Sequence, residues 1–409
     1  MQTHRGRLSA FTLVIALAGC APSSIGARTP ASVQPSASVE PSEAPVASAS
    51  PIGAAQGFPI EVFAHLGDEP VPDELAAELQ RVLDTSANGD GVTAALITPE
   101  GTWSGATGFA AGHRAMVPND QMSIASITKT LVAAQVMRLV EAGELALDDL
   151  AADRLSPDLE FDTNGARVVD LLSMRSGISE YFADEQQLRN ALLRYPLRVW
   201  TLEEKLATVA PERGPVGQQS EWEYIGTNYL LLGLIVEHVT GRPIAEVLRS
   251  GVLAGDGYER LIYQPDERPS DPMAMPLGAS ADTFDEHGGY LPSIANATMF
   301  TSEGAMASDA PSLARWFRAL CAGEVVSAAS VDQMTDFDAR PGYGLGIIDR
   351  RDEYGWDSGA VGHTGLAREG YRTAALCFQN PGVVVVVLAN DDDHDVDTTA
   401  GDLWRAASV

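Results

Sequence analysis

The sequence predicts an α/β domain of the α+β type, in which strands from both ends of the domain form one sheet and a mostly helical segment is inserted between them. Three observations predict it. Residues 92–108 are rich in strand formers and are interrupted by a short turn at 99–101. Residues 383–388 form a continuous run of valine and leucine, which is typical of a buried strand. Residues of roughly 150–290 show mostly helical patterns and loops.

Helices are expected to accompany these strands. Apolar residues at helical spacing follow Pro72, and Asp73 and Glu74 supply the acidic first turn that favours a helix start. A second amphipathic run begins after Ser126, and Gly143 is a suitable C-terminal cap for it. In chain order, the expected elements are a helix over 72–83, strands over 92–97 and 102–108, a helix from 126 to about 143, a strand over 383–388 and a helix over about 395–407.

The first 57 residues are not expected to fold with this domain. In residues 1–20, Arg5 and Arg7 precede an apolar stretch that is too short to span a bilayer, as in a bacterial export signal. The segment ends in Leu-Ala-Gly-Cys, which looks like a lipobox, so Cys20 is expected to carry lipid. The alternative is an ordinary signal peptide with an incidental cysteine. Residues 21–57 are almost wholly Ala, Ser, Pro and Val and predict a disordered tether.

Residues 58–409 are then expected to form the folded domain. We expect this domain to lie outside the cytoplasm and to contact the membrane only through the lipid anchor. The formal net charge of −29 argues against nucleic acid, because phosphate binding needs clustered Lys and Arg. The acidic run 391–395 lacks the spacing of a calcium loop, so a solvated turn is expected there and not a metal site. Cys321 and Cys377 either pair with each other or remain two separate buried thiols. We expect a monomer.

Ser126 and Lys129 are the strongest candidates for chemistry. They are three residues apart at the start of a predicted helix, so both side chains share one face and the amine can reach the serine oxygen. A serine needs a nearby base, or a charge that favours the alkoxide, before it can attack a carbonyl. Burial and the helix N-terminus are both expected to lower the pKa of Lys129 and so let it act as that base. The chain has only one other lysine, Lys205.

Two later segments complete a candidate site. Tyr224 precedes the helical run that starts near residue 230, where it can pass a proton to a leaving group; taken alone, such a tyrosine is usually core or surface. His363, Thr364 and Gly365 are expected in a strand at the edge of a cleft, although an isolated histidine near a turn is more often structural. The backbone N–H groups of Ser126 and Leu366 are then expected to form an oxyanion hole.

The order and spacing of these motifs resemble the serine β-lactamase and penicillin-binding superfamily, in the branch of class C β-lactamases, D-Ala-D-Ala carboxypeptidases and related esterases. The resemblance runs from about residue 92 to 390 and is carried by the segments 123–129, 171–177, 227–233, 343–346 and 362–365. It implies an antiparallel sheet flanked by helices, an all-helical subdomain and an active site in the groove between them. It implies no metal and no cofactor.

The resemblance also implies a role for each site residue. Ser126 would be the nucleophile, Lys129 its proton partner and Tyr224 the acid or base of the second motif. His363 would take the place of the lysine of class C β-lactamases. Thr364, with an arginine such as Arg350 or Arg372, would hold a substrate carboxylate.

One residue departs from the family pattern. The second motif is usually Tyr-x-Asn, but this chain has Gly226 where the asparagine would stand. The amide that would bond to the lysine and to the substrate's amide carbonyl is therefore missing, and Asn228 lies two residues further on. Loss of such a hydrogen bond at a reacting centre costs about 3 kcal/mol. We expect this to weaken β-lactamase activity more than acylation in general.

The leading hypothesis is a lipid-anchored serine hydrolase that acts through an acyl-enzyme on D-Ala-D-Ala peptides or a related D-amino acid peptide. Penicillin is expected to acylate this enzyme, and the acyl group should be released slowly. A second hypothesis is an esterase for small acyl esters, which would tolerate Gly226. A third is a non-catalytic lipoprotein that binds penicillin or peptide. The substrate is accordingly a small peptide, a β-lactam or an ester.

Overall fold

The computed structural model describes residues 57–182, 184–217, 221–277 and 293–408. The expected signal peptide, Cys20 and nearly all of the tether lie outside the described residues. All of the structure described below belongs to one compact unit. Within the described part of the chain, no helix is long and apolar enough to cross a bilayer.

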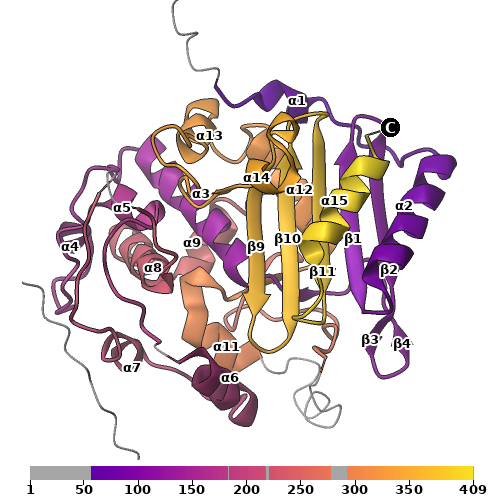
Figure 1. Cartoon of the computed structure of the whole chain (residues 1–409). Helices are drawn as coiled ribbons and strands as arrows, with labels where there is room; N and C mark the ends of the chain where they lie inside the picture. The colour runs from indigo at the N-terminus through magenta and orange to yellow at the C-terminus, as the bar shows by residue number, and fades with distance from the viewer. Residues whose placement is uncertain (1–56, 183, 218–220, 278–292, 409) are drawn as a thin grey trace, which may run out of the picture. The chain divides into compact units, whose positions relative to one another are not determined.

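A six-stranded sheet in the order β2-β1-β11-β10-β9-β8 forms the centre of the domain, and its neighbouring strands are all antiparallel (Figure 1). Strands from the two ends of the domain meet in the middle of the sheet, where Ala95 of β1 pairs with Val386 of β11. The strands are β1 (Val92–Thr98), β2 (Gly101–Thr107), β8 (Ile348–Asp349), β9 (Val361–Ala367), β10 (Tyr371–Phe378) and β11 (Val383–Ala389).

The valine run of β11 is buried on both faces of the sheet. Because side chains alternate along a strand, Val385 and Val387 face one apolar core and Val384 and Val386 face the other. The first core lies under α2 (Asp73–Ala87) and α15 (Val396–Ala406), which lie side by side in front of the sheet in Figure 1. The second includes α12 (Ala310–Cys321) and α3 (Thr128–Glu141).

The segment between β2 and β8 is mostly helical and packs beside the sheet around α3 and α8 (Figure 1). Its helices include α4 (Ala151–Arg154), α5 (Val168–Leu172), α6 (Glu185–Arg194), α7 (Leu202–Leu206), α8 (Gly226–Thr240), α9 (Ile244–Ser250), α11 (Ser293–Phe300), the 3₁₀ turn η2 (Thr301–Glu303) and α13 (Ala328–Met334). The remaining short elements are α1 (Ile60–Ala64), α14 (Arg351–Tyr354), the 3₁₀ turn η3 (Trp356–Ser358), the pair β3 (Phe109–Ala111) and β4 (Arg114–Ala115), and the small sheet of β5 (Met122–Ser123), β6 (Ile262–Tyr263) and β7 (Met306–Ser308).

The structure confirms the predicted fold class and the predicted strands and helices. The hairpin of β1 and β2 closes at Gly101, which pairs with Thr98 and has a φ of 141° that favours glycine. The first helix continues four residues beyond its predicted end at 83, to Ala87. The nucleophile segment begins with a 3₁₀ turn before α3, because Ala125 has left-handed backbone geometry that a regular helix does not allow.

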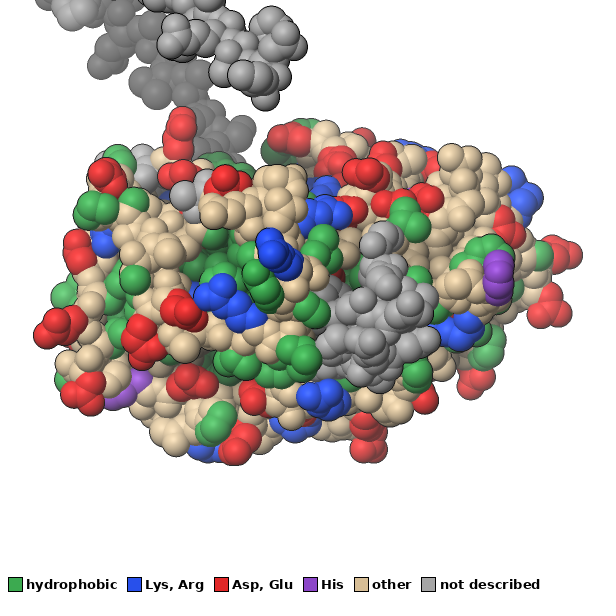
Figure 2. All heavy atoms as spheres, turned by 90° about the horizontal axis from the view of Figure 1, so that it is seen from below, with side chains coloured by type: hydrophobic (Ala, Val, Ile, Leu, Met, Phe, Trp, Pro, Cys, Tyr) green, Lys and Arg blue, Asp and Glu red, His purple; other side chains and the backbone are tan. Residues whose placement is uncertain are grey.

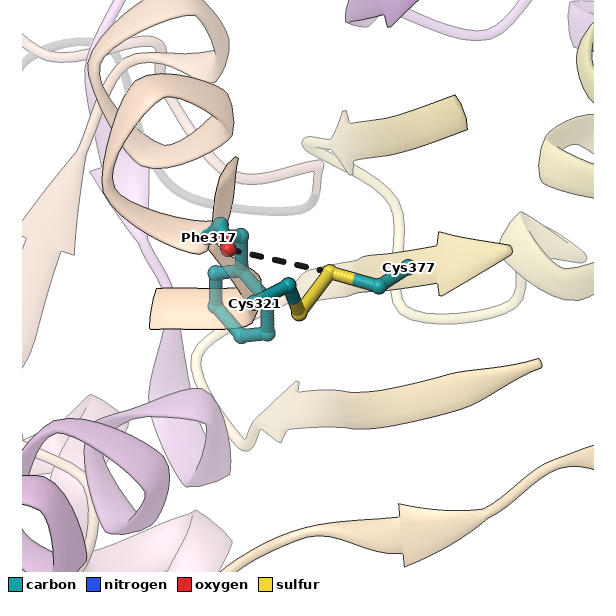
Figure 3. The surroundings of a disulfide bond; sticks show 3 residues. All are labelled: Phe317, Cys321 and Cys377. Carbon is teal, nitrogen blue, oxygen red and sulfur yellow. Dashed lines mark hydrogen bonds between the residues drawn. A yellow bond between two sulfur atoms is a disulfide. The ribbon is translucent and has the colours of Figure 1, made fainter. Parts of the chain in front are cut away.

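Cys321 at the end of α12 and Cys377 in β10 are joined by a disulfide bond (Figure 3). The sequence left open whether these two cysteines pair. Both are buried, and the carbonyl oxygen of Phe317 lies 3.7 Å from the sulfur of Cys377. The disulfide ties a helix of the second core to a central strand of the sheet.

The surface reflects the acidic composition. Figure 2 shows acidic side chains scattered over one face of the molecule, with hydrophobic and basic side chains among them. In the run 391–395, Asp395 caps α15 by accepting a hydrogen bond from the N–H of Thr398. His394 lies 2.9 Å from Asp90. These contacts give the run a structural role as the connection between β11 and α15.

Candidate active site

The nucleophile lies on a strained turn. Ser126 is the middle residue of the 3₁₀ turn η1 (Ala125–Ile127), which leads directly into α3. The preceding residue, Ala125, has a φ of 45°, an uncommon value for a residue with a side chain. Backbone strain of this kind persists where the surrounding structure enforces it, and it is frequent at active sites. Ser126 is half-buried while its neighbours are buried, so its hydroxyl is the exposed group of the turn.

Lys129 reaches the serine as predicted. Its Nζ lies 3.1 Å from Ser126 Oγ, 2.9 Å from the backbone oxygen of Glu303 and 2.9 Å from Glu303 Oε2. An ammonium group has three N–H donors, and these three acceptors match them. Lys129 is 1% exposed, so the ion pair with Glu303 is shielded from water.

The predicted direction of the lysine pKa shift was wrong. Burial does lower the pKa of Lys129, but the charge of Glu303, assisted by Tyr224, outweighs it, so the pKa is raised above its ordinary value. The lysine with a lowered pKa is Lys205, which burial brings to about 8 and whose ammonium donates to the carbonyl of Thr298. Lys129 is therefore an ammonium at neutral pH and donates a hydrogen bond to Ser126.

Tyr224 lies beside the Ser126 and Lys129 pair, just before α8. The ring centre of Tyr224 is 5.0 Å from Lys129 Nζ and 6.0 Å from the imidazole of His363. The side chain is among the exposed large hydrophobic groups, at 40% exposure. This position, between the buried lysine and solvent, is suited to proton exchange with a bound substrate.

His363 is a buried, neutral histidine in β9. Its Nδ1 lies 2.6 Å from the carbonyl oxygen of Thr364, so Nδ1 carries the proton, and Nε2 accepts from the hydroxyl of Tyr343 at 3.2 Å. Burial, with the nearby charge of Lys129, lowers the pKa of His363 to about 3. His363 is therefore uncharged at neutral pH, unlike the lysine whose place the family resemblance assigns to it.

The strand β9 lies against the nucleophile turn at Gly365. A Cβ atom at Gly365 would lie 2.4 Å from the carbonyl oxygen of Ile124 and 3.1 Å from the Cβ of Ala125. Among the described strands, β8 pairs with β9 only at Val361 and Gly362, so no further strand covers the edge of β9 beyond them. From His363 onward, the edge of β9 is therefore not paired with another strand among the described residues.

Thr364 and Leu366 both belong to this edge. Thr364 is half-buried and Leu366 is 38% exposed, while Gly365 between them is buried, so the two side chains share the accessible face of β9. The role of the Leu366 N–H as an oxyanion donor stays a prediction. Arg350 is already paired with Asp397 and Glu353, which makes it a poor candidate for binding a substrate carboxylate.

Sequence reasoning missed three acidic or phenolic groups beneath the site. Glu303 accepts a hydrogen bond from the hydroxyl of Tyr181, and both side chains are buried. Glu180 accepts from the N–H of Gly226 at 2.6 Å at the start of α8. Burial, with the charge of Glu303, raises the pKa of Glu180 to about 7. Gly226, which stands where the family pattern has asparagine, was the one feature of the sequence that could have indicated another residue, Glu303, in the space of the missing amide.

The described residues contain no group of three or more His, Cys, Asp or Glu side chains placed to hold a metal ion. The site geometry is that of a serine nucleophile with a buried ammonium partner, facing an open strand edge. This arrangement defines a class of protein, the hydrolases that form an acyl-enzyme on a Ser-x-x-Lys motif.

Comparison with known proteins agrees with this class. The family model "Beta-lactamase" matches residues 78–408. The chain is 32% identical over 146 residues to penicillin-binding protein 4 of Amycolatopsis lactamdurans, an alignment that covers 35% of this chain and 36% of that protein. The aligned region therefore spans about a third of that relative.

Solved structures share the fold over most of the chain. D-amino acid amidase from Ochrobactrum anthropi SV3 matches with a TM-score of 0.66 and 24% identity, over 82% of this chain and 98% of the amidase. A D-stereospecific amidohydrolase from Streptomyces sp. matches with a TM-score of 0.62 and 22% identity, over 82% and 98%. A penicillin-binding protein homologue from Pyrococcus abyssi matches with a TM-score of 0.61 and 22% identity, over 80% and 75%. The chain belongs to the beta-lactamase family of serine hydrolases.

Proposed function

We propose that this protein hydrolyses amide bonds formed by the carboxyl group of a D-amino acid residue, through an acyl-enzyme on Ser126. The observation that carries the proposal is the hydrogen bond of 3.1 Å between Lys129 Nζ and Ser126 Oγ, on a strained turn that faces the open edge of β9. The likeness to a D-amino acid amidase and to a D-stereospecific amidohydrolase supports D-amino acid derivatives as the substrate class.

In the proposed reaction, the oxygen of Ser126 attacks the substrate carbonyl while its proton passes to the Tyr224 oxygen. Tyr224 gives its own proton to the leaving nitrogen, so the amine departs neutral and the tyrosine ends as it began. Lys129, held as an ammonium by Glu303, stabilises the charge that develops on the serine oxygen. Water then repeats the sequence in reverse and releases the D-amino acid residue.

Turnover of matched enantiomers tests this function. The wild-type protein should release ammonia from D-phenylalanine amide at least about tenfold faster than from L-phenylalanine amide, and Ser126→Ala should lose turnover by about four to six orders of magnitude. N-acylated D-Ala-D-Ala peptide and p-nitrophenyl acetate complete the panel.

Each alternative predicts a different pattern in the same panel. Hydrolysis of the ester alone would identify an esterase and overturn the amide proposal. Equal binding of D-phenylalanine amide by wild type and Ser126→Ala, without turnover of any member, would identify a binding protein.

We also propose that the protein is a lipoprotein anchored outside the cytoplasm through Cys20. The lipobox-like segment that ends at Cys20 supports this, and so does the disulfide between Cys321 and Cys377, because disulfides persist in oxidising compartments. Membrane fractions of cells labelled with a palmitate analogue should contain the labelled wild-type protein. Cys20→Ser should carry no label, and a labelled Cys20→Ser protein would contradict the proposal.

A further inference from the structure

The absent side chain at Gly226 does not leave a hole. A Cβ atom placed there would lie 2.2 Å from Glu303 Oε2 and 2.5 Å from the carboxyl carbon of Glu303. Gly226 is not among the residues with positive φ, so its backbone geometry would accept a larger residue. In this arrangement, the carboxylate of Glu303 occupies the space that a side chain at position 226 would take.

Glu303 comes from a different part of the chain and is held in place on several sides. It ends the 3₁₀ turn η2 and is 5% exposed. One carboxylate oxygen accepts from Lys129 at 2.9 Å, and the other accepts from the hydroxyl of Tyr181. The turn starts at Thr301, which has a strained φ of 39°. The backbone oxygen of Glu303 binds Lys129 as well.

We propose that Glu303 is a positioning residue that takes over the lysine-binding role of the missing asparagine. The present pair, Gly at position 226 and Glu at position 303, is then exchangeable with Asn at position 226 and a small residue at position 303. The inference deepens the proposed function and rests on it for its consequences in catalysis. The same side-chain space beside Lys129 is filled from η2 in this protein, whereas an asparagine at position 226 would fill it from the start of α8.

The exchange has a consequence for substrate choice. A side-chain amide both accepts and donates hydrogen bonds, whereas an ionised carboxylate only accepts. Both oxygens of Glu303 are already occupied by Lys129 and Tyr181. The carboxylate of Glu303 therefore cannot donate a hydrogen bond to the amide carbonyl of a substrate, as the side chain of an asparagine could. The site is expected to disfavour N-acylated substrates, including penicillins with an acylamino side chain, relative to amino acid amides and esters with a free amine.

The pH behaviour of the site depends on every charged or titratable group near Lys129. The carboxylate of Glu303 contacts Lys129 directly, and the ring centres of Tyr224 and Tyr229 lie 5.0 and 6.0 Å from Lys129 Nζ. The charge of Lys129 acts to lower the pKa values of Glu180 and His363. Glu303 in turn accepts a hydrogen bond from Tyr181 and interacts electrostatically with Lys205. Among these groups, Glu303 is the carboxylate in direct contact. Neutralising it should remove the main influence that opposes the effect of burial on Lys129.

A double-mutant cycle on the whole protein tests the exchange. Wild type, Gly226→Asn, Glu303→Ala and the double variant would be compared on D-phenylalanine p-nitroanilide and on its N-acetyl derivative. Each single variant should lose at least about tenfold in kcat/KM. In Gly226→Asn the new side chain overlaps the carboxylate of Glu303, and in Glu303→Ala the ammonium of Lys129 loses its carboxylate partner. The double variant should recover most of this loss and cleave the N-acetyl substrate about 10- to 100-fold faster than wild type.

Glu303→Gln separates positioning from simple support of the fold. It keeps the shape of the side chain and removes its charge, so the pKa of Lys129 should fall. Because the proposed reaction uses Lys129 as an ammonium, the alkaline limb of the kcat/KM profile should move to lower pH in this variant, with the protein still folded. An unchanged limb, or a double variant no better than the worse single variant, would overturn the proposal.

Thermal unfolding of the same four proteins gives a result that does not depend on turnover. Gly226→Asn should be destabilised, and Glu303→Ala in the same chain should relieve part of that loss, because the overlap is gone. If wild type shows no turnover but this coupling is present, the proposed function fails and the structural exchange stands. If turnover is present but neither cycle shows coupling, the proposed function stands and the exchange fails.

Discussion

The protonation states of Lys129 and His363 in the candidate site depend on their partners more than on their burial. Lys129 and His363 are both almost fully buried, and burial alone would make both neutral. Within the described parts of the chain, the partners of His363 are the hydroxyl of Tyr343 and the carbonyl of Thr364, and His363 is neutral, whereas Lys129 has the carboxylate of Glu303 at 2.9 Å. At an effective dielectric constant of about 20, opposite charges at 4 Å attract by about 4 kcal/mol, enough to reverse a moderate desolvation penalty.

The neutral state of His363 predicts a pH effect on stability. Its pKa of about 3 lies below the value of about 6.5 in the unfolded chain, so the unfolded state binds more protons between these values. Stability contributed by the neutral imidazole is present above pH 6.5 and is lost as the pH falls toward 3. Wild type should therefore lose up to about 3 kcal/mol more than His363→Asn between pH 7 and pH 4 in urea unfolding. If the free energies of unfolding of the two proteins changed with pH in parallel, the pKa of His363 would not be lowered by folding, which would contradict the prediction.

At the scale of elements, the site depends on how closely β9 approaches the nucleophile turn. Gly365 permits that approach, because a side chain there would meet the carbonyl oxygen of Ile124, a backbone atom. Local sequence patterns predicted the strand, the helix and the glycine. They could not indicate Glu303, because η2 and α3 are far apart in the chain and only the folded structure brings them to the same lysine.

Gly365→Ala should therefore push β9 away from Ser126. We expect a loss of about 1–3 kcal/mol in the free energy of unfolding, and a fall in kcat/KM of at least about tenfold, because the strand edge is displaced from the reacting carbonyl. Gly214→Ala is a suitable control, since the nearest atom to its Cβ would be 3.5 Å away. Wild-type activity in Gly365→Ala would contradict the close approach.

At the scale of the whole molecule, the architecture was predictable and part of the chemistry was not. The valine run of β11 and the hairpin at Gly101 were recognisable because strand pattern and turn chemistry are local. The pairing of Cys321 with Cys377 depends on the packing of α12 on the sheet, so the sequence allowed two outcomes. The shift in the pKa of Lys129 depends on a long-range ion pair, and the prediction from burial and the helix N-terminus had the wrong sign.

The disulfide predicts a difference in stability. Replacing both cysteines by serine should lower the free energy of unfolding by about 2–4 kcal/mol, because the unfolded chain gains freedom between positions 321 and 377 and buried sulfur is replaced by hydroxyl. Activity at low temperature should remain, since neither cysteine belongs to the site. Denatured wild-type protein should react with iodoacetamide at these cysteines only after reduction, and labelling without reduction would contradict the bond.

The most direct test of the account is intact-mass spectrometry of the protein after incubation with 6-aminopenicillanic acid, a β-lactam with a free amine, beside Ser126→Ala. The account predicts one covalent adduct of the mass of this β-lactam on wild type, located at Ser126, and none on the variant. Benzylpenicillin, which carries an acylamino group, should react more slowly. An equal adduct on Ser126→Ala, or no adduct on wild type with either β-lactam and none with a p-nitrophenyl ester, would contradict the assignment of Ser126 as the nucleophile.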